Sequence, residues 1–255
     1  MSFIINPFRY TAAGLAVDAV TFDGSNDSMN HGGAGLTGVA NSKVMVFSCW
    51  LKFEAGGDGA GQHIFNVGSS GDEAFTLRRG ADDKLVFKLT STAGAEIMEM
   101  LSSSAWDSTD GWIHIAAGAD LSVPISRLVI NGTDDKGAVN NLTDATINWT
   151  DSGNAFAGSD ISAGTLLDAD MAELYFDETT YIDFSDSDKV ALFRDGDNKP
   201  VDLGADGSTP NAVQPIIYQH IDNGEAADNF KLNAGTGGDF TVVGALTTAS
   251  TSPSD

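Results

Sequence analysis

The chain has 255 residues and carries 36 Asp and Glu against 13 Lys and Arg, which gives a formal net charge of -23. A surface this acidic repels a phosphate backbone, so we expect no direct binding of nucleic acid. No stretch approaches the roughly 20 apolar residues that a membrane helix needs, so we also expect no insertion into a membrane.

The chain begins with an arm, followed by a strand and a polar turn. We expect residues 1–19 to form an N-terminal arm that docks through isolated aromatic side chains. Residues 20–29, VTFDGSNDSM, then predict a short strand that breaks into a turn rich in Gly, Asn and Asp. Such a turn either holds a ligand or only connects two strands.

Alternating apolar residues predict core strands in the first half of the chain. Residues 45–53 place every second side chain, all but one of them large and apolar, on one face. Residues 75–89 predict a β-hairpin, and residues 113–117 predict a further strand. The dipeptide Asn131-Gly132 follows an apolar run and predicts a tight hairpin, because both turn positions need positive φ.

The next segment is less regular. Residues 138–163 are polar and loop-like, with Trp149 and Phe156 as isolated anchors. Residues 168–178, DADMAELYFDE, resume the alternation of a strand.

The end of the chain combines one short helix with a long extension. An acidic first turn and a small apolar stripe predict the helix within residues 184–196. Residues 196–255 are rich in Gly and Pro, so we expect a C-terminal extension that wraps over a surface. Its tail is expected to be disordered from about residue 247.

In this order the pieces resemble the concanavalin A-like lectin/glucanase superfamily, in its laminin G-like and pentraxin-like version. The resemblance rests on six motifs in the family's order, which are residues 22–27, Trp50 with Lys52, the 75–89 hairpin, residues 112–114, residues 128–132, and residues 171–176 before the helix. It implies an all-β jelly-roll sandwich of two antiparallel sheets over residues 20–195.

Residues 198–210 and 229–253 separately resemble the C-terminal parts of tailed-bacteriophage virion proteins that carry a lectin-like jelly roll. This resemblance implies a location in the virion, as a structural protein of the capsid decoration, fibre or tail adsorption type. The partners it implies are other virion proteins and further copies of the chain in a homo-oligomer. Glycans of the host cell surface are the implied ligands.

The catalytic carboxylates of the family's glucanases are missing. Those enzymes supply them from one strand as Glu-x-Asp-x-Glu, because alternate residues project on the same face. No such triplet occurs here, and in residues 168–178 the acids Glu173 and Asp177 are four positions apart. We therefore expect that the protein is not an enzyme.

Calcium is the cofactor that the resemblance implies. Several family members hold the ion with carboxylates from the Asp-Gly-x-x-Asp turn and nearby loops. By position, Asp27 is the first implied ligand, with Asp23 and Glu173 next, although Ala172 stands where an Asp is often found. The alternative is structural, since Asp and Asn are common in turns.

Sugar binding on such a sandwich usually relies on loop aromatics that stack on pyranose faces. Trp106, Trp149 and Phe156 lie in loop-like segments and are the expected ligand-binding residues, whereas Trp50 and Trp112 are expected in the core. Packing against the edge of the sandwich is the structural alternative for each loop aromatic. The alternative to a virion role is a calcium-assisted carbohydrate-binding module without a structural role.

Overall fold

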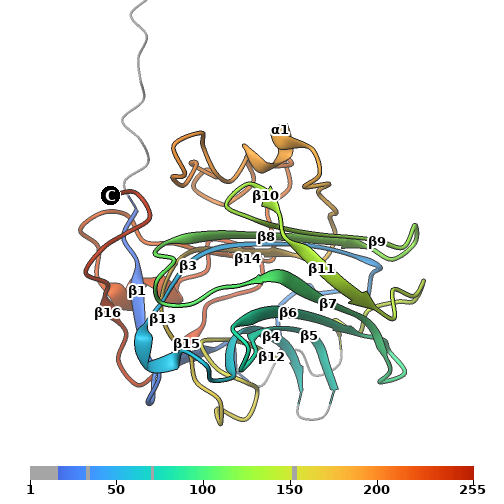
Figure 1. Cartoon of the computed structure of the whole chain (residues 1–255), viewed down its shortest axis with the longest axis horizontal. Helices are drawn as coiled ribbons and strands as arrows, with labels where there is room; N and C mark the ends of the chain where they lie inside the picture. The colour runs from blue at the N-terminus through green and yellow to red at the C-terminus, as the bar shows by residue number, and fades with distance from the viewer. Residues whose placement is uncertain (1–16, 33–34, 70–71, 151–153) are drawn as a thin grey trace, which may run out of the picture.

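Two antiparallel sheets of eight strands each lie face to face (Figure 1). The structure is a computed structural model that describes residues 17–32, 35–69, 72–150 and 154–255. Its architecture is the concanavalin A-like jelly-roll sandwich expected from the sequence.

Each sheet mixes strands from distant parts of the chain. The first sheet contains, in spatial order, β10 (Thr133–Asp134), β9 (Ile125–Ile130), β8 (Ile113–Asp120), β3 (Val44–Phe53), β13 (Asp168–Asp177), β1 (Val20–Asp23) and β16 (Thr247–Thr248), with β14 (Ile217–Gln219) also paired to β13. The second sheet contains β11 (Lys136–Asn140), β7 (Glu96–Ala105), β6 (Lys84–Thr90), β5 (Asp72–Arg79), β4 (Gln62–Ser69), β12 (Asn154–Ala157), β2 (Ser28–Asn30) and β15 (Thr241–Val243). The short helices are η1 (Ala55–Gly57), α1 (Ser187–Val190) and η2 (Ala227–Lys231).

The core lies between the sheets and confirms the alternation predicted for residues 45–53. Phe47 of β3 packs against Phe65 and Phe75 of the second sheet, with ring centroids 5.7 and 5.9 Å apart. Ser48 points to the other face of β3, where its Oγ lies 2.8 Å from Nε2 of buried His114. One face of β3 therefore carries the main core, and the other carries Val46 and Trp50 of two smaller apolar clusters beside the Ser48–His114 contact.

The outer face of the first sheet is covered by residues that follow β13. Tyr175 packs edge-on against Phe193, with centroids 5.2 Å apart, and α1 precedes Phe193 in this cover (Figure 1). The side chain of Asp186 accepts a hydrogen bond from the backbone N–H of Asp188 at 2.9 Å and caps α1. This cover buries groups on the sheet that would otherwise face solvent.

The structure differs from the expected boundary at residue 195, because residues 196–255 are part of the sandwich. β14 pairs with β13, β15 pairs with β2, and β16 pairs with β1. Ile217, Phe230 and Phe240 are buried in the main core. A strand was expected within residues 239–246, which contain β15. The sequence showed no sign of β14 and β16, because each spans only two or three residues, too few to show a pattern of alternation.

The end of the chain is packed, which differs from the expected disordered tail. Ser254 Oγ donates to the carbonyl of Val17 at 2.9 Å, and Lys199 Nζ donates to the carbonyl of Ser254 at 2.6 Å. Residues 1–16 of the expected N-terminal arm lie outside the described residues, so the arm stays a prediction. Among the helices in the described part of the chain, none has the length and apolar character to cross a membrane.

Candidate functional site

The acidic side chains of the opening turn accept hydrogen bonds from backbone N–H groups. Asp23 Oδ1 accepts hydrogen bonds from the backbone N–H groups of Ser25 and Asn26, at 2.9 and 3.1 Å. These bonds stabilise the carboxylate and lower the pKa of Asp23. Asp27 is buried, and its Oδ1 accepts from the backbone N–H of Ala245 at 2.8 Å. The turn therefore fastens the C-terminal strands to the start of the sandwich.

Glu173 lies elsewhere, on the outer face of the first sheet. It occupies a bulge in β13, has a φ of 51°, and accepts from the Tyr218 hydroxyl at 2.9 Å through Oε2. Within the residues that the structure describes, no group of three or more His, Cys, Asp or Glu side chains is arranged to hold a metal ion. Asp23, Asp27 and Glu173 are thus not brought together as one calcium-ligand set.

Of the three expected ligand-binding aromatics, Trp149 lies in the core and Phe156 lies on strand β12. Trp149 is fully buried, packs edge-on against Phe176 at 5.3 Å, and donates its indole N–H to Ser42 Oγ at 2.9 Å. It offers no ring face to a ligand, which corrects the expectation for this residue. Phe156 is half-buried on β12, where its buried neighbours Ala155 and Ala157 face the core.

Trp106 is half-buried and its indole is held by a buried carboxylate. Nε1 donates to Asp135 Oδ2 at 2.8 Å. The other oxygen, Oδ1, accepts from the hydroxyl of Ser103 and from both the hydroxyl and the backbone N–H of Ser104, the last two at 2.8 and 3.1 Å. Asp135 therefore fixes the indole and both serine side chains in one arrangement.

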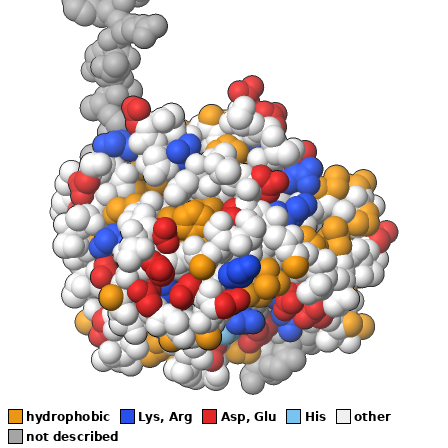
Figure 2. Space-filling view, in the orientation of Figure 1, with side chains coloured by type: hydrophobic (Ala, Val, Ile, Leu, Met, Phe, Trp, Pro, Cys, Tyr) orange, Lys and Arg blue, Asp and Glu red, His pale blue; other side chains and the backbone are white. Residues whose placement is uncertain are grey.

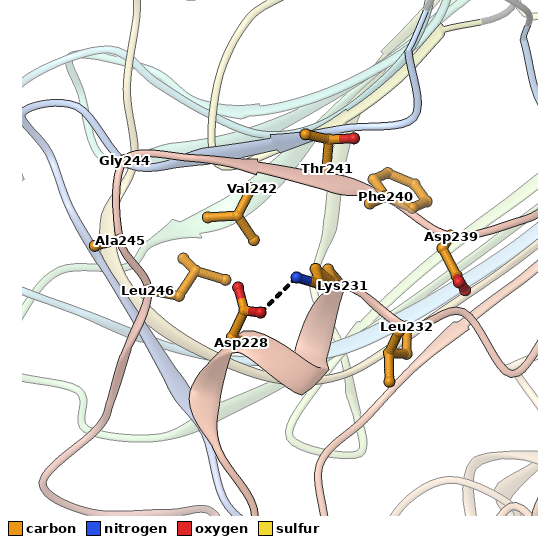
Figure 3. Close-up of a pocket in the computed structure, with 10 residues that line it drawn as sticks. All are labelled: Asp228, Lys231, Leu232, Asp239, Phe240, Thr241, Val242, Gly244, Ala245 and Leu246. Carbon is orange, nitrogen blue, oxygen red and sulfur yellow. Dashed lines mark hydrogen bonds and ion pairs between the residues drawn. The ribbon is translucent and has the colours of Figure 1, made fainter.

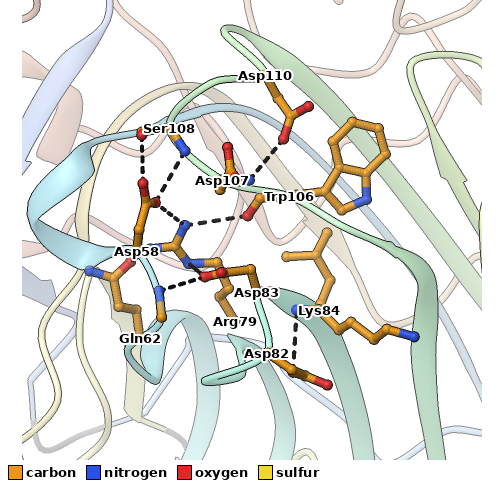
Figure 4. Close-up of polar contacts among 12 residues, drawn as sticks. Asp58, Gln62, Arg79, Asp82, Asp83, Lys84, Trp106, Asp107, Ser108 and Asp110 are labelled. Atoms are coloured by element: carbon orange, nitrogen blue, oxygen red, sulfur yellow. Dashed lines mark hydrogen bonds and ion pairs between the residues drawn. The ribbon is translucent and has the colours of Figure 1, made fainter.

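The backbone of Trp106 is held by a second network, centred on the fully buried Arg79 (Figure 4). Arg79 Nη1 donates to the carbonyl of Trp106 at 3.3 Å and to Asp58 Oδ1 at 3.1 Å. Nη2 donates to Gln62 Oε1 at 2.8 Å, and the guanidinium lies 4.2 Å above the ring of Phe53. A buried charge persists only when it is paired and hydrogen-bonded in this way. The buried guanidinium of Arg79 therefore holds the loop that contains Trp106 in place.

A hollow of about 350 Å³ opens beside Trp106, between β7 and the β9–β10 hairpin. Its lining consists of Ser103, Ser104, Trp106, Ile130, Asn131, Thr133, Asp134 and Asp135. The hairpin follows the prediction, because Asn131 and Gly132 have φ values of 50° and 77°. The hollow combines one indole with hydroxyl, carboxamide and carboxylate groups, which is a surface suited to a polar ligand with apolar faces.

Trp112 lines a second hollow, of about 440 Å³, together with Lys52, Asp197 and Lys199. It was expected in the core, but it is half-buried and precedes β8, and its indole N–H donates to Thr251 Oγ1 at 3.2 Å. The sequence signal for this position is the glycine directly before Trp112. Gly111 has a positive φ, so the chain turns there and β8 begins only after Trp112.

A further hollow, of about 600 Å³, lies between η2 and β15 (Figure 3). Its walls include the aliphatic side chains of Leu232, Val242 and Leu246, and Asp228 and Lys231 form an ion pair on η2. The aromatic residue in its lining, Phe240, is only 3% exposed, so it presents little ring surface. This hollow is less suited to stacking on a sugar than the one beside Trp106.

The two packed antiparallel sheets define a jelly-roll sandwich of the concanavalin A-like fold class. Among solved structures, the "putative carbohydrate binding protein" from Bacteroides ovatus is similar at a TM-score of 0.60 and 13% identity, covering 93% of this chain and 61% of that chain. A heptameric SAP-like pentraxin from Limulus polyphemus is similar at a TM-score of 0.51 and 13% identity, covering 82% of this chain and 93% of that chain.

At such low identity, the likeness to these two structures establishes the fold alone. No family model matches the sequence, and no curated protein matches it.

Proposed function

We propose that this chain binds carbohydrate in the hollow beside Trp106. The observation that carries the proposal is the fixed indole of Trp106, held through Nε1 by Asp135 and through its carbonyl by Arg79. A sugar has an apolar face that stacks on an indole and hydroxyl groups that bond to nearby polar side chains. Because the aromatic and its neighbours are already ordered, little conformational entropy is lost on binding.

Two further features support this choice of ligand. Ser103, Ser104, Asn131 and Thr133 supply neutral donors and acceptors beside the carboxylates of Asp134 and Asp135, and this mixture suits the hydroxyl groups of a sugar. The similar structure from Bacteroides ovatus carries carbohydrate binding in its name, which supports the same ligand class here by analogy of fold.

A glycan array comparing the wild type with Trp106→Ala tests the proposal. We expect the wild type to bind a set of related glycans and the variant to lose about tenfold in affinity, because a stacking contact on an aromatic ring contributes on the order of 0.5–1.5 kcal/mol beyond the area that it buries. Trp112→Ala is the matched control, since it removes a half-buried indole at another hollow. Equal loss in both variants, or none in either, would contradict the assignment.

Calcium dependence stays a prediction that the same array tests with and without a chelator. The alternative function, a calcium-assisted carbohydrate-binding module, predicts that chelation removes binding. The site at Trp106 predicts binding that survives chelation, because its polar groups bond to one another and to the indole without an ion.

For the biological setting, we infer an exterior position on a tailed-phage particle, as a capsid decoration, fibre or tail adsorption protein. The resemblance of residues 198–210 and 229–253 to phage virion proteins supports this setting. Its partners would be other virion proteins and further copies of the chain. Immunogold labelling of purified particles tests the inference, and we expect label on the particle surface. Purified particles without label would contradict the virion location. The alternative would then be a carbohydrate-binding module without a structural role.

A further inference from the structure

The serine hydroxyl groups in the hollow beside Trp106 have their hydrogen atoms already engaged. Ser103 and Ser104 are exposed and line the hollow, and the hydroxyl of each donates to Asp135 Oδ1. A serine hydroxyl has one hydrogen to donate and two lone pairs with which to accept. Toward a ligand in the hollow, both side chains therefore act only as acceptors.

Asp135 is a buried acceptor that receives donors at both oxygens. Besides the two hydroxyl groups, Oδ1 accepts from the backbone N–H of Ser104 at 3.1 Å, and Oδ2 accepts from the indole N–H of Trp106 at 2.8 Å. A carboxylate has about four lone-pair sites, and these donors fill them. Asp135 therefore adds a fixed negative charge to the lining and offers a ligand no free donor.

Asp134 adds a second carboxylate, which is exposed. Its Oδ1 accepts from the backbone N–H of Lys136 at 3.1 Å. In the part of the chain that the structure describes, no Lys or Arg belongs to the lining. Two basic side chains near the hairpin are engaged elsewhere, since Lys136 Nζ donates to the carbonyl of Ser126 at 3.1 Å and Arg194 Nε donates to Asn198 Oδ1 at 2.5 Å. The charge of the lining is therefore of one sign.

Side-chain donors come from Asn131 and Thr133. Asn131 Oδ1 accepts from the backbone N–H of His114 at 2.8 Å, which leaves Nδ2 as the part of the carboxamide that can bind a ligand. The hydroxyl of Thr133 is on an exposed residue and can donate or accept. Acceptors thus outnumber donors in the lining, and a ligand that fits it brings hydrogen-bond donors of its own.

We propose that the hollow beside Trp106 selects sugars whose hydroxyl groups donate hydrogen bonds and excludes sugars that carry a carboxylate or sulfate group, with Asp134 as the specificity-determining residue. The proposal rests on the proposed carbohydrate function and names the class of sugar. A carboxylate or sulfate brings only acceptors to a lining of acceptors, and it brings negative charge to negative charge. Such a mismatch against one ligand class produces specificity for the other.

A glycan array of matched pairs tests the proposal on the full chain at an ionic strength of about 0.01 M. The array carries oligosaccharides of glucose, galactose and mannose, each beside its counterpart built from the corresponding uronic acid, and further neutral glycans beside their sialylated or sulfated forms. We expect the bound glycans to be those without acidic groups, and each acidic counterpart to bind at least about tenfold more weakly.

Asp134→Asn separates charge from shape, because it keeps the size of the side chain and the acceptor for Lys136. We expect this variant to reduce the ratio of neutral to acidic affinity at least about threefold. Asp202→Asn is the matched control, since it removes one charge from an exposed residue that lines a different hollow, and it should leave the ratio unchanged. Raising the ionic strength to about 0.5 M should reduce the wild-type ratio as well, because salt screens the repulsion.

Trp106→Ala distinguishes failure of this proposal from failure of the proposed function. Acidic glycans that bind as tightly as their neutral counterparts, and lose binding in Trp106→Ala, would overturn the selectivity and leave the carbohydrate site in place. An unchanged ratio in Asp134→Asn would overturn the role of Asp134. Binding that survives Trp106→Ala, or no binding to any glycan, would contradict the proposed function and the selectivity with it.

Discussion

Glu173 and Glu178 are buried carboxyl groups, and each has one oxygen without a hydrogen-bond partner among the described residues. Burial raises the pKa of Glu173 to about 8 and that of Glu178 to about 7. The folded chain therefore binds more protons than the unfolded chain at neutral pH. The stability that these groups contribute is fully present below pH 4.5 and is lost as the pH rises through 7 and 8.

We predict that the free energy of unfolding falls between pH 6 and pH 9, by on the order of 1–3 kcal/mol for Glu173 alone. Urea denaturation at a series of pH values measures this change. Glu173→Gln should flatten the decline, while Glu225→Gln, at an exposed position, should not. A wild-type stability that is constant or rises over this range would show that Glu173 is ionised in the folded chain.

At the scale of elements, β14, η2 and β15 place side chains of residues 196–255 in the core, so we expect this segment to be necessary for folding. Ile217, Phe230 and Phe240 are each at most 3% exposed in the core. Loss of one such side chain costs about 2–5 kcal/mol, so loss of all three exceeds much of the roughly 5–15 kcal/mol of a typical domain. We predict that a chain ending at residue 195 shows no cooperative thermal unfolding by circular dichroism.

The matched control for that truncation is removal of residues 249–255 alone. This shorter deletion removes the Ser254 contacts to Val17 and Lys199 but no member of the main core, so it should only lower Tm by a few degrees. Cooperative unfolding of the chain ending at residue 195 would contradict the integration of the C-terminal strands.

The elements that were predictable from sequence are those whose signal is local. The alternation of β3 identified Phe47 as a core residue, and Asn131-Gly132 identified the β9–β10 turn. Trp106 was predicted as a candidate ligand-binding residue, but its partner Asp135 was not, because their contact joins positions that only the fold brings together. Trp149 was misplaced for the same reason, since its burial depends on strands remote in sequence.

At the scale of the whole molecule, the net charge of -23 opposes the compact state. Red acidic side chains are spread over the face shown in Figure 2, with fewer blue basic ones between them. We predict that raising ionic strength from about 0.01 to 0.15 M raises Tm, because the Debye length falls from about 30 to 8 Å and screens this repulsion. Differential scanning calorimetry measures the change, and a lower Tm at the higher ionic strength would show that attractive ion pairs outweigh repulsion.

The indole N–H resonances of the tryptophans report directly on the site assigned to carbohydrate. Trp106 lines the hollow, whereas Trp149 is fully buried and serves as an internal control in the same spectrum. The measurement is an NMR titration of the full chain with the best glycan from the array, with each resonance assigned by substitution. We predict a saturable shift of the Trp106 signal and none of the Trp149 signal. A bound glycan that leaves the Trp106 signal unmoved would contradict carbohydrate binding in this hollow.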